Sequence, residues 1–168
     1  HFAEISDSST KLNDSSKSVD LTHRKQSKRY ASKPKQIKRV NINLAGATEL
    51  KTLRGIGPVL SKRIVKFREA LGGFYSVNQL AEVYGLQDSV YQGLRKFLVC
   101  SGHIEKKNLN TASDSTLYRH PYCSYSLAKR ILKYRNLHGA FGSIPELYHI
   151  HGVDSVELER LIPYLSTD

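Results

Sequence analysis

Residues 50–65 of this 168-residue chain have the sequence LKTLRGIGPVLSKRIV. Apolar residues at helical spacing on both sides of two glycines predict two helices joined by a short loop. Pro58 suits the first turn of the second helix, where its missing N–H costs nothing. We expect Gly55 and Gly57 to allow a turn too tight for a Cβ, and Ile56 to fill the gap between the helices.

The start of the second helix is a candidate anion site. The first amides of a helix have no partner within the helix, and the helix dipole places positive charge at the same end. The amides of Gly55, Gly57 and the first helical turn would therefore point at an anion such as a phosphate. A second interpretation stays open, in which the two glycines serve only as a helix connector.

The pattern belongs to an internal repeat. Residues 40–98 align with residues 107–165 at a constant offset of 67, without gaps. Asn43 matches Asn110, and the following helices share a Lys-Arg-Ile segment. Two copies that agree at so many positions should share one fold. Further matched pairs are Leu50 and Leu117, Lys66 and Lys133, Arg68 and Arg135, Phe74 and Phe141, Leu80 and Leu147, and Gly85 and Gly152.

Apolar residues recur at helical spacing in both copies, and no segment alternates apolar and polar residues as a half-buried strand would. Leu60, Ile64, Phe67 and Leu71 form one such stripe. The predicted fold class is all-α, with two tandem units of about four short helices each. The predicted helices span 47–53, 58–71, 77–83 and 88–98, then 114–120, 125–137, 144–150 and 155–162.

Both copies carry helix start and stop signals. Ser76 and Gln79 have the spacing of a capping box, and Ser143 and Glu146 repeat it. Glycines are expected to end the preceding helices, because they adopt left-handed backbone conformations without strain. These helix-ending glycines are Gly72, Gly73 and Gly139.

The formal net charge of +11 points to an anionic partner, either nucleic acid or an anionic membrane surface. Residues 1–39 carry ten basic and four acidic side chains and are predicted to be a disordered basic tail. The tail is interpreted either as a solvated linker or as an arm that adds phosphate contacts. Residues 40–100 have a net charge of +4 and form the first predicted unit; residues 101–168 have +1 and form the second.

The segment from Val40 through Gly55-Ile56-Gly57 to the Phe74-x-Ser76 pattern resembles the helix-hairpin-helix domain of ComEA-like competence proteins, which bind DNA during uptake. The resemblance covers residues 40–100 directly and 107–165 through the repeat. It implies sequence-independent binding of double-stranded DNA, in uptake or in repair. The site residues it implies are Arg54, Gly55, Ile56, Gly57, Val59, Leu60, Lys62, Arg63 and Lys66.

The resemblance also implies a monovalent cation held by the loop carbonyls of Lys51, Leu53 and Ile56, and no cofactor. Among the four hairpins only the first keeps Gly-Ile-Gly. The loop at 122–124 has lost both glycines, and Asp154 would repel a phosphate at the last hairpin. We therefore expect the second unit to keep the fold and lose most of the phosphate site. The alternative function is a scaffold whose second unit binds another protein.

No Ser-His-Asp set, paired acids or phosphate-binding loop appears, so the sequence predicts a non-enzymatic protein without a small-molecule substrate. His149 and His151 are not joined by other metal ligands, and no metal site is expected. Whether Cys100 and Cys123 form a disulfide is left open. Because the chain begins at His1 and contains no Met, it is interpreted as a fragment or a processed product. The resemblance favours the cell envelope, with the cytoplasm as alternative.

Overall fold

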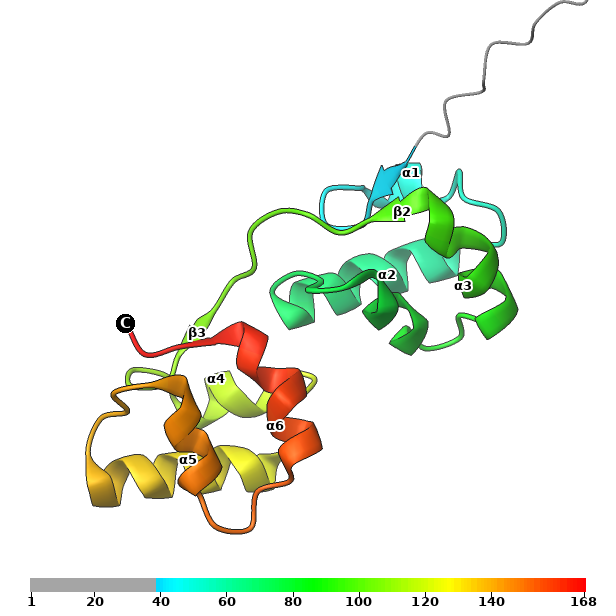
Figure 1. The fold of residues 1–168 in the computed structure, drawn as a ribbon. Helices are drawn as coiled ribbons and strands as arrows, with labels where there is room; N and C mark the ends of the chain where they lie inside the picture. Colours follow the sequence, from blue (N-terminus) through cyan, green and yellow to red (C-terminus); the bar gives the residue numbers. More distant parts are fainter. Residues whose placement is uncertain (1–38) are drawn as a thin grey trace, which may run out of the picture. The chain divides into compact units, whose positions relative to one another are not determined.

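The computed structural model describes residues 39–168, which belong to one compact unit. The basic tail predicted for residues 1–39 lies outside the described residues, apart from Arg39. The described part consists mostly of short helices, and the same order of elements occurs twice (Figure 1). The predicted all-α fold class is confirmed. No helix in the described part is long and apolar enough to cross a membrane.

The first repeat starts and ends with a two-residue strand and has helices between them. Its longest helix is α2, which packs on α1 and is followed by short helical segments (Figure 1). The elements are β1 Val40–Asn41, α1 Ala47–Leu50, α2 Pro58–Leu71, the 3₁₀ helix η1 Val77–Glu82, α3 Asp88–Leu94, the 3₁₀ helix η2 Arg95–Phe97 and β2 Leu98–Val99.

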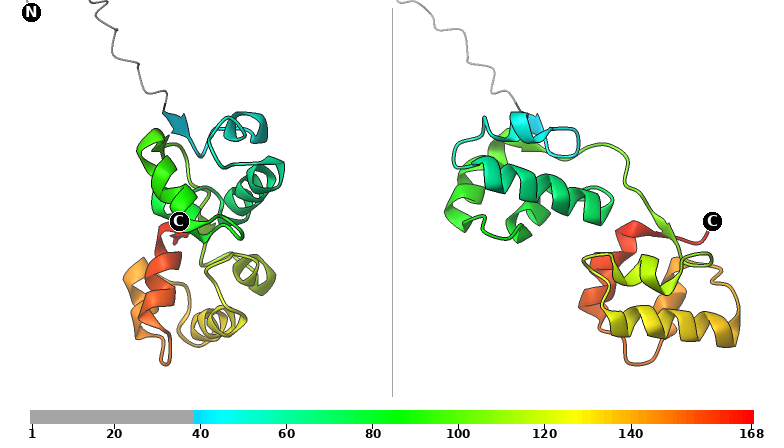
Figure 2. Two further views of the ribbon diagram at one scale, coloured as in Figure 1. Left: turned by 90° about the vertical axis from the view of Figure 1, so that its right-hand side faces the viewer. Right: turned by 180° about the vertical axis from the view of Figure 1, so that it is seen from behind.

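The second repeat has the same elements in the same order. Its longest helix, α5, occupies the position of α2 (Figures 1 and 2). The elements are β3 Lys107–Asn108, α4 Asp114–Tyr118, α5 Tyr125–His138, the 3₁₀ helix η3 Ile144–His149, α6 Ser155–Leu161, the 3₁₀ helix η4 Ile162–Tyr164 and β4 Leu165–Ser166.

The strands were not expected from the sequence. β1 pairs with β2 in parallel, with Val40 opposite Leu98, and β3 pairs with β4 in the same register, with Lys107 opposite Leu165. Each pair joins the beginning of a repeat to its end. Strands of two residues are too short to show an alternating pattern, so the sequence carries no signal for them.

The predicted helices 77–83 and 144–150 form as 3₁₀ helices, and the predicted helix 88–98 gives way to η2 and then β2. The Ser76 capping box is confirmed. The prediction of a second capping box at Ser143 is wrong, because the Ser143 hydroxyl donates to Glu146 and caps no backbone amide. Pro145 stands in this first turn and removes one of the amides that a cap would hold.

A buried core runs through both repeats. Of the predicted stripe on α2, Ile64 and Leu71 are fully buried, while Leu60 and Phe67 are partly buried against them. The predicted glycine stops are present, since Gly72 and Gly139 end their helices at φ +80° and +87°. The largest fully buried side chains are Tyr164, Phe74, Ile42, Leu50, Ile64, Leu71, Leu80, Leu109, Leu117, Leu127, Ile131 and Leu147.

In each repeat an asparagine joins the segment before the first helix to the segment after the longest helix. Asn43 Oδ1 accepts from the Phe74 amide at 2.7 Å, and its Nδ2 donates to the Phe74 carbonyl at 2.9 Å. Asn110 makes the same pair of hydrogen bonds with Phe141, at 2.8 and 3.0 Å. The side chain thus satisfies the donor and the acceptor of one residue that is 31 positions away in sequence.

An arginine on the longest helix of each repeat fixes the loop before the first helix. Arg68 donates to the carbonyls of Ile42 and Ala45, at 3.0 and 2.7 Å. Arg135 donates in the same way to Leu109 and Ala112. These two matched arginines therefore serve the fold rather than a ligand.

We expect Asn43→Ala to lower the free energy of unfolding by about 2 kcal/mol, because it leaves the Phe74 amide without its partner and leaves the Phe74 carbonyl with only the Cys100 thiol as donor. Urea denaturation followed by circular dichroism measures the change. Asn136, which is exposed on α5, provides the control, and Asn136→Ala should change stability little. Equal effects from the two substitutions would contradict this role of Asn43.

Candidate nucleic-acid interface

Gly55 is required by the fold. Its φ is +89°, and a Cβ added there would lie 2.7 Å from Cγ1 of Val90. Both the left-handed conformation and the contact with α3 therefore exclude a side chain. Ile56 follows as a buried residue, which confirms that it fills the gap between the helices.

Gly57 is different, and the prediction of a turn too tight for a Cβ is wrong for it. Its backbone is extended, with φ −86° and ψ −178°, and a Cβ added there meets nothing within 4 Å. The fold would therefore accept another residue at this position. The missing side chain has a different effect: no side chain caps the start of α2.

The amides at this start remain available. Within residues 39–168, the amides of Gly55, Gly57, Val59 and Leu60 make no hydrogen bond, while the Ser61 amide is the first to bond back, to Gly57. Val59 is 61% exposed and both glycines are exposed. Four amide donors at or just before the positive end of a 14-residue helix are thus left without a partner among the described residues.

Three of the four corresponding amides of the second repeat, those of Tyr122, Ser124 and Leu127, are occupied. Ser124 stands where Gly57 is in the first repeat, and its Oγ accepts from the Leu127 amide at 3.1 Å. The Ser124 amide itself donates to Glu157 Oε1 at 2.7 Å. Glu157 replaces the apolar Val90 of the first repeat, so a carboxylate of the chain lies where the first repeat would hold an external anion.

The cationic side chains around the first hairpin differ in their partners. Arg54, Lys62 and Lys66 are exposed and form no ion pair with a carboxylate in the described part. Lys129, the counterpart of Lys62, lies with Nζ 4.6 Å from the ring centroid of Tyr125. The second repeat also has Pro121 in place of Arg54, so it offers fewer free cations.

Arg63 has a structural partner. Its Nη1 donates to the carbonyl of Tyr84 at 2.9 Å, and the guanidinium lies 4.8 Å from the Tyr84 ring centroid. Gly85 leaves room for this arginine, because a Cβ there would come within 2.5 Å of Nη1. Arg130 donates to His151 in the same way beside Gly152. The space that the arginine side chain needs explains why both repeats have a glycine at this position.

The three carbonyls expected to hold a monovalent cation belong to the loop before α2. The Leu53 carbonyl accepts from the Ile56 amide at 3.0 Å, and those of Lys51 and Ile56 accept no hydrogen bond from the described residues. A carbonyl oxygen has two lone pairs, so the bond to Leu53 does not prevent a second contact. The cation therefore remains a prediction.

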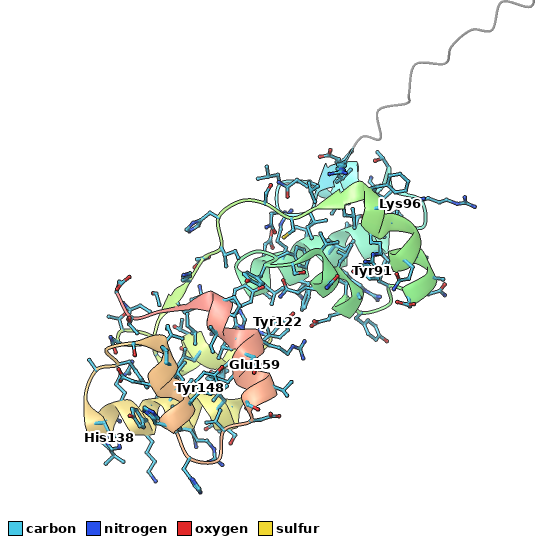
Figure 3. All side chains as sticks on the ribbon, viewed as in Figure 1. Tyr91, Lys96, Tyr122, His138, Tyr148 and Glu159 are labelled. Atoms are coloured by element: carbon cyan, nitrogen blue, oxygen red, sulfur yellow. The ribbon has the colours of Figure 1, made fainter. Side chains whose placement is uncertain are left out.

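Tyr122 occupies the position of Gly55 and contacts the first repeat. Its hydroxyl accepts from Gln79 Nε2 at 3.0 Å and donates to Glu82 at 2.9 Å, and the ring is labelled in Figure 3. Arg160 pairs with Glu82 and lies over the Tyr122 ring at 4.3 Å. The altered hairpin thus makes hydrogen bonds to η1, which no pattern in the sequence predicted.

His120 is buried in the same cluster. Its Nδ1 accepts from the Tyr122 amide at 3.2 Å, so the proton of the neutral ring is on Nε2, 3.2 Å from the Leu71 carbonyl. Burial lowers the pKa of His120, because the charged imidazolium would lose its hydration. The hydrogen bond to Leu71 acts in the opposite direction but is the smaller effect.

The two cysteines are free thiols. Burial, with a smaller contribution from Glu157, raises the pKa of Cys123 to about 12, so its thiol is protonated at neutral pH. Cys100 donates to the Phe74 carbonyl. In residues 39–168, no three His, Cys, Asp or Glu side chains come together as metal ligands.

The helix-hairpin-helix motif family matches this chain at residues 35–99 and again at 103–166, which is more than half of its length. The chain belongs to the helix-hairpin-helix family. Such motifs are commonly nucleic-acid binding, which is consistent with the exposed amides and free cations of the first helix-hairpin-helix repeat. The narrower resemblance to ComEA-like competence proteins is not confirmed. No solved structure matches.

Several vertebrate relatives share the name endonuclease/exonuclease/phosphatase family domain-containing protein 1. The zebrafish protein is 31% identical over 143 residues, and the human protein 28% over 154. These matches cover 73% of this chain and 26–27% of the relatives, so the helix-hairpin-helix chain spans about a quarter of their length. A *Haemophilus influenzae* uncharacterized protein is 45% identical over 49 residues, 29% of this chain and 44% of that protein.

These names correct the prediction of a non-enzymatic protein, which is wrong. The relatives are named for an endonuclease/exonuclease/phosphatase domain, and the match covers 26–27% of their length. The sequence argument rested on catalytic motifs within 168 residues. It could not detect chemistry that a relative's name places in a much longer protein, of which the match covers 26%.

We expect stability to fall as the pH drops from about 7 to about 5, because the unfolded chain binds a proton at His120 near pH 6.5 and the folded chain binds it only at lower pH. Urea denaturation across this range measures the slope. His120→Gln should reduce it, and His138→Gln, at an exposed position on α5, should not. An unchanged slope in His120→Gln would contradict the assignment.

Proposed function

We propose that the first repeat binds double-stranded DNA without sequence preference, through the backbone amides at the start of α2. The amides of Gly55, Gly57, Val59 and Leu60 hold one phosphate, and Lys62, Arg54 and Lys66 add charge contacts beside it. Amides and cations of this kind contact the sugar-phosphate backbone and carry no information about base sequence. The affinity should therefore depend strongly on salt.

The observation that carries this proposal is the open space around Gly57. A serine fits there, as Ser124 does in the second repeat, and would stabilise α2 by capping it. The first repeat has a glycine instead and leaves its amides exposed. A position that the fold does not restrict, and that gives up a helix cap, supports a role in binding an external anion.

The relatives' names suggest what this binding serves. We propose that the two repeats are the DNA-binding part of a protein that also carries an endonuclease/exonuclease/phosphatase domain. A module that holds the DNA backbone regardless of sequence keeps such a domain near its substrate at high effective concentration. This favours a role in DNA processing or repair over uptake.

A specific observation favours a scaffold as the second candidate function. The second repeat already uses its altered hairpin for contacts to protein groups, through Tyr122 and Glu82. A scaffold without DNA binding would retard no duplex DNA even at low salt. Retardation at low salt that weakens as salt rises supports DNA binding instead.

We expect Gly57→Ser to lower the affinity for duplex DNA roughly 10- to 100-fold while leaving the fold intact, because its hydroxyl would take the Leu60 amide from the phosphate. Gly57→Asp should weaken binding further through charge repulsion. Fluorescence anisotropy with a labelled blunt duplex measures both. Asp154→Gly is the control and should leave the affinity unchanged; equal losses from Gly57→Asp and Asp154→Gly would refute this location of the site.

A second test concerns Lys62. Lys62→Gln should reduce the slope of log affinity against log salt by about 1, as expected for the loss of one phosphate contact. Lys129→Gln changes the matched position of the second repeat, where the lysine lies against Tyr125, and should leave the slope unchanged. Equal changes in both variants would mean that the positive charge of the whole chain, rather than this site, attracts the DNA.

A further inference from the structure

Tyr84 has the most exposed large hydrophobic side chain of the described residues, at 82%. It lies in the loop between η1 and α3. An exposed tyrosine is by itself ordinary on a protein surface. Tyr84 differs in that its surroundings hold it in a defined position beside the proposed phosphate site.

Arg63 fixes this loop on α2. Its Nη1 donates to the Tyr84 carbonyl at 2.9 Å, and the neighbouring Gly85 lies near the Leu60 side chain, since a Cβ built on Gly85 would be 3.8 Å from Cδ2 of Leu60. Leu60 is one of the residues whose amide points at the proposed phosphate. Tyr84 is thereby placed next to the first turns of α2, in contact with Arg63.

The ring of Tyr84 has one occupied side and one free side. The Arg63 guanidinium lies over it, 4.8 Å from the centroid. Because most of the side chain is exposed, the opposite face remains open to a planar ligand. A cation behind an aromatic ring, beside a positively charged surface, is the arrangement that proteins use to stack unpaired bases.

The charge of this loop argues against a second phosphate cradle. Residues 81–90 contain no basic side chain and two acidic ones; Glu82 is paired with Arg160, and Asp88 forms no ion pair within residues 39–168. A phosphate would be repelled there, whereas the uncharged face of a base would not. The base is therefore the part of a nucleic acid that this loop fits.

We propose that Tyr84, backed by Arg63, is a stacking platform for an unpaired DNA base next to a duplex whose phosphate is held at the start of α2. This inference rests on the proposed function of the first repeat. It deepens that function by naming the ligand: DNA with a duplex and an adjoining single-stranded nucleotide, as at an overhang or a gap.

The test compares a blunt duplex with the same duplex carrying a short single-stranded overhang, with 2-aminopurine as its first unpaired base. The full chain should bind the overhang form about 5- to 150-fold more tightly, the range expected for stacking one base. Binding should also quench 2-aminopurine fluorescence. Tyr84→Ala should lose both effects and keep its affinity for the blunt duplex, and Tyr84→Phe should keep both.

Tyr148, an exposed tyrosine (51%) on η3 of the second repeat that is labelled in Figure 3, is the control. Tyr148→Ala should behave like the unmodified chain. Equal affinity of the unmodified chain for both DNA forms, or a preference that survives in Tyr84→Ala, would overturn the stacking role and leave duplex binding standing. Failure of the unmodified chain to bind the blunt duplex would instead refute the proposed function, and the inference with it.

Discussion

The first turn of α2 begins without a side-chain cap, and the proposed function depends on this condition. A helix start needs partners for its free amides, which come from side chains, water or a ligand. Ser124 supplies one for α5 and Asp154 one for α6, through its bond to the Val156 amide. Gly57 supplies none, so the first amides of α2 have no side-chain acceptor and could bind water or an anion.

The two repeats have the same fold but make different contacts at their first hairpins. The parts that build the fold are the same in both, including the asparagine that holds a phenylalanine backbone and the arginine that fixes the opening loop. Two differences change the first hairpin. The second repeat has Tyr122 there, whose hydroxyl bonds to the first repeat, and Glu157 on α6 occupies the Ser124 amide.

Charge must be read together with contacts before it indicates a binding surface. Arg63, Arg68, Arg130 and Arg135 all donate to backbone carbonyls and stabilise loops. Lys62 and Lys66 form no ion pair with a carboxylate among residues 39–168. The sequence predicted Arg63 as a direct DNA contact, and this stays a prediction; in the structure its guanidinium donates to the Tyr84 carbonyl and lies over the Tyr84 ring.

The sequence by itself determined the repeat, the helices and the hairpin, because helical periodicity, glycines and capping residues act over a few neighbouring positions. Only the tertiary structure decided which glycine the fold requires, since Val90 excludes a side chain at Gly55 and nothing does so at Gly57. It also decided the strand pairs and the capture of the Ser124 amide by Glu157. These contacts join residues 33 or more positions apart, and local spacing carries no information about which distant atoms meet.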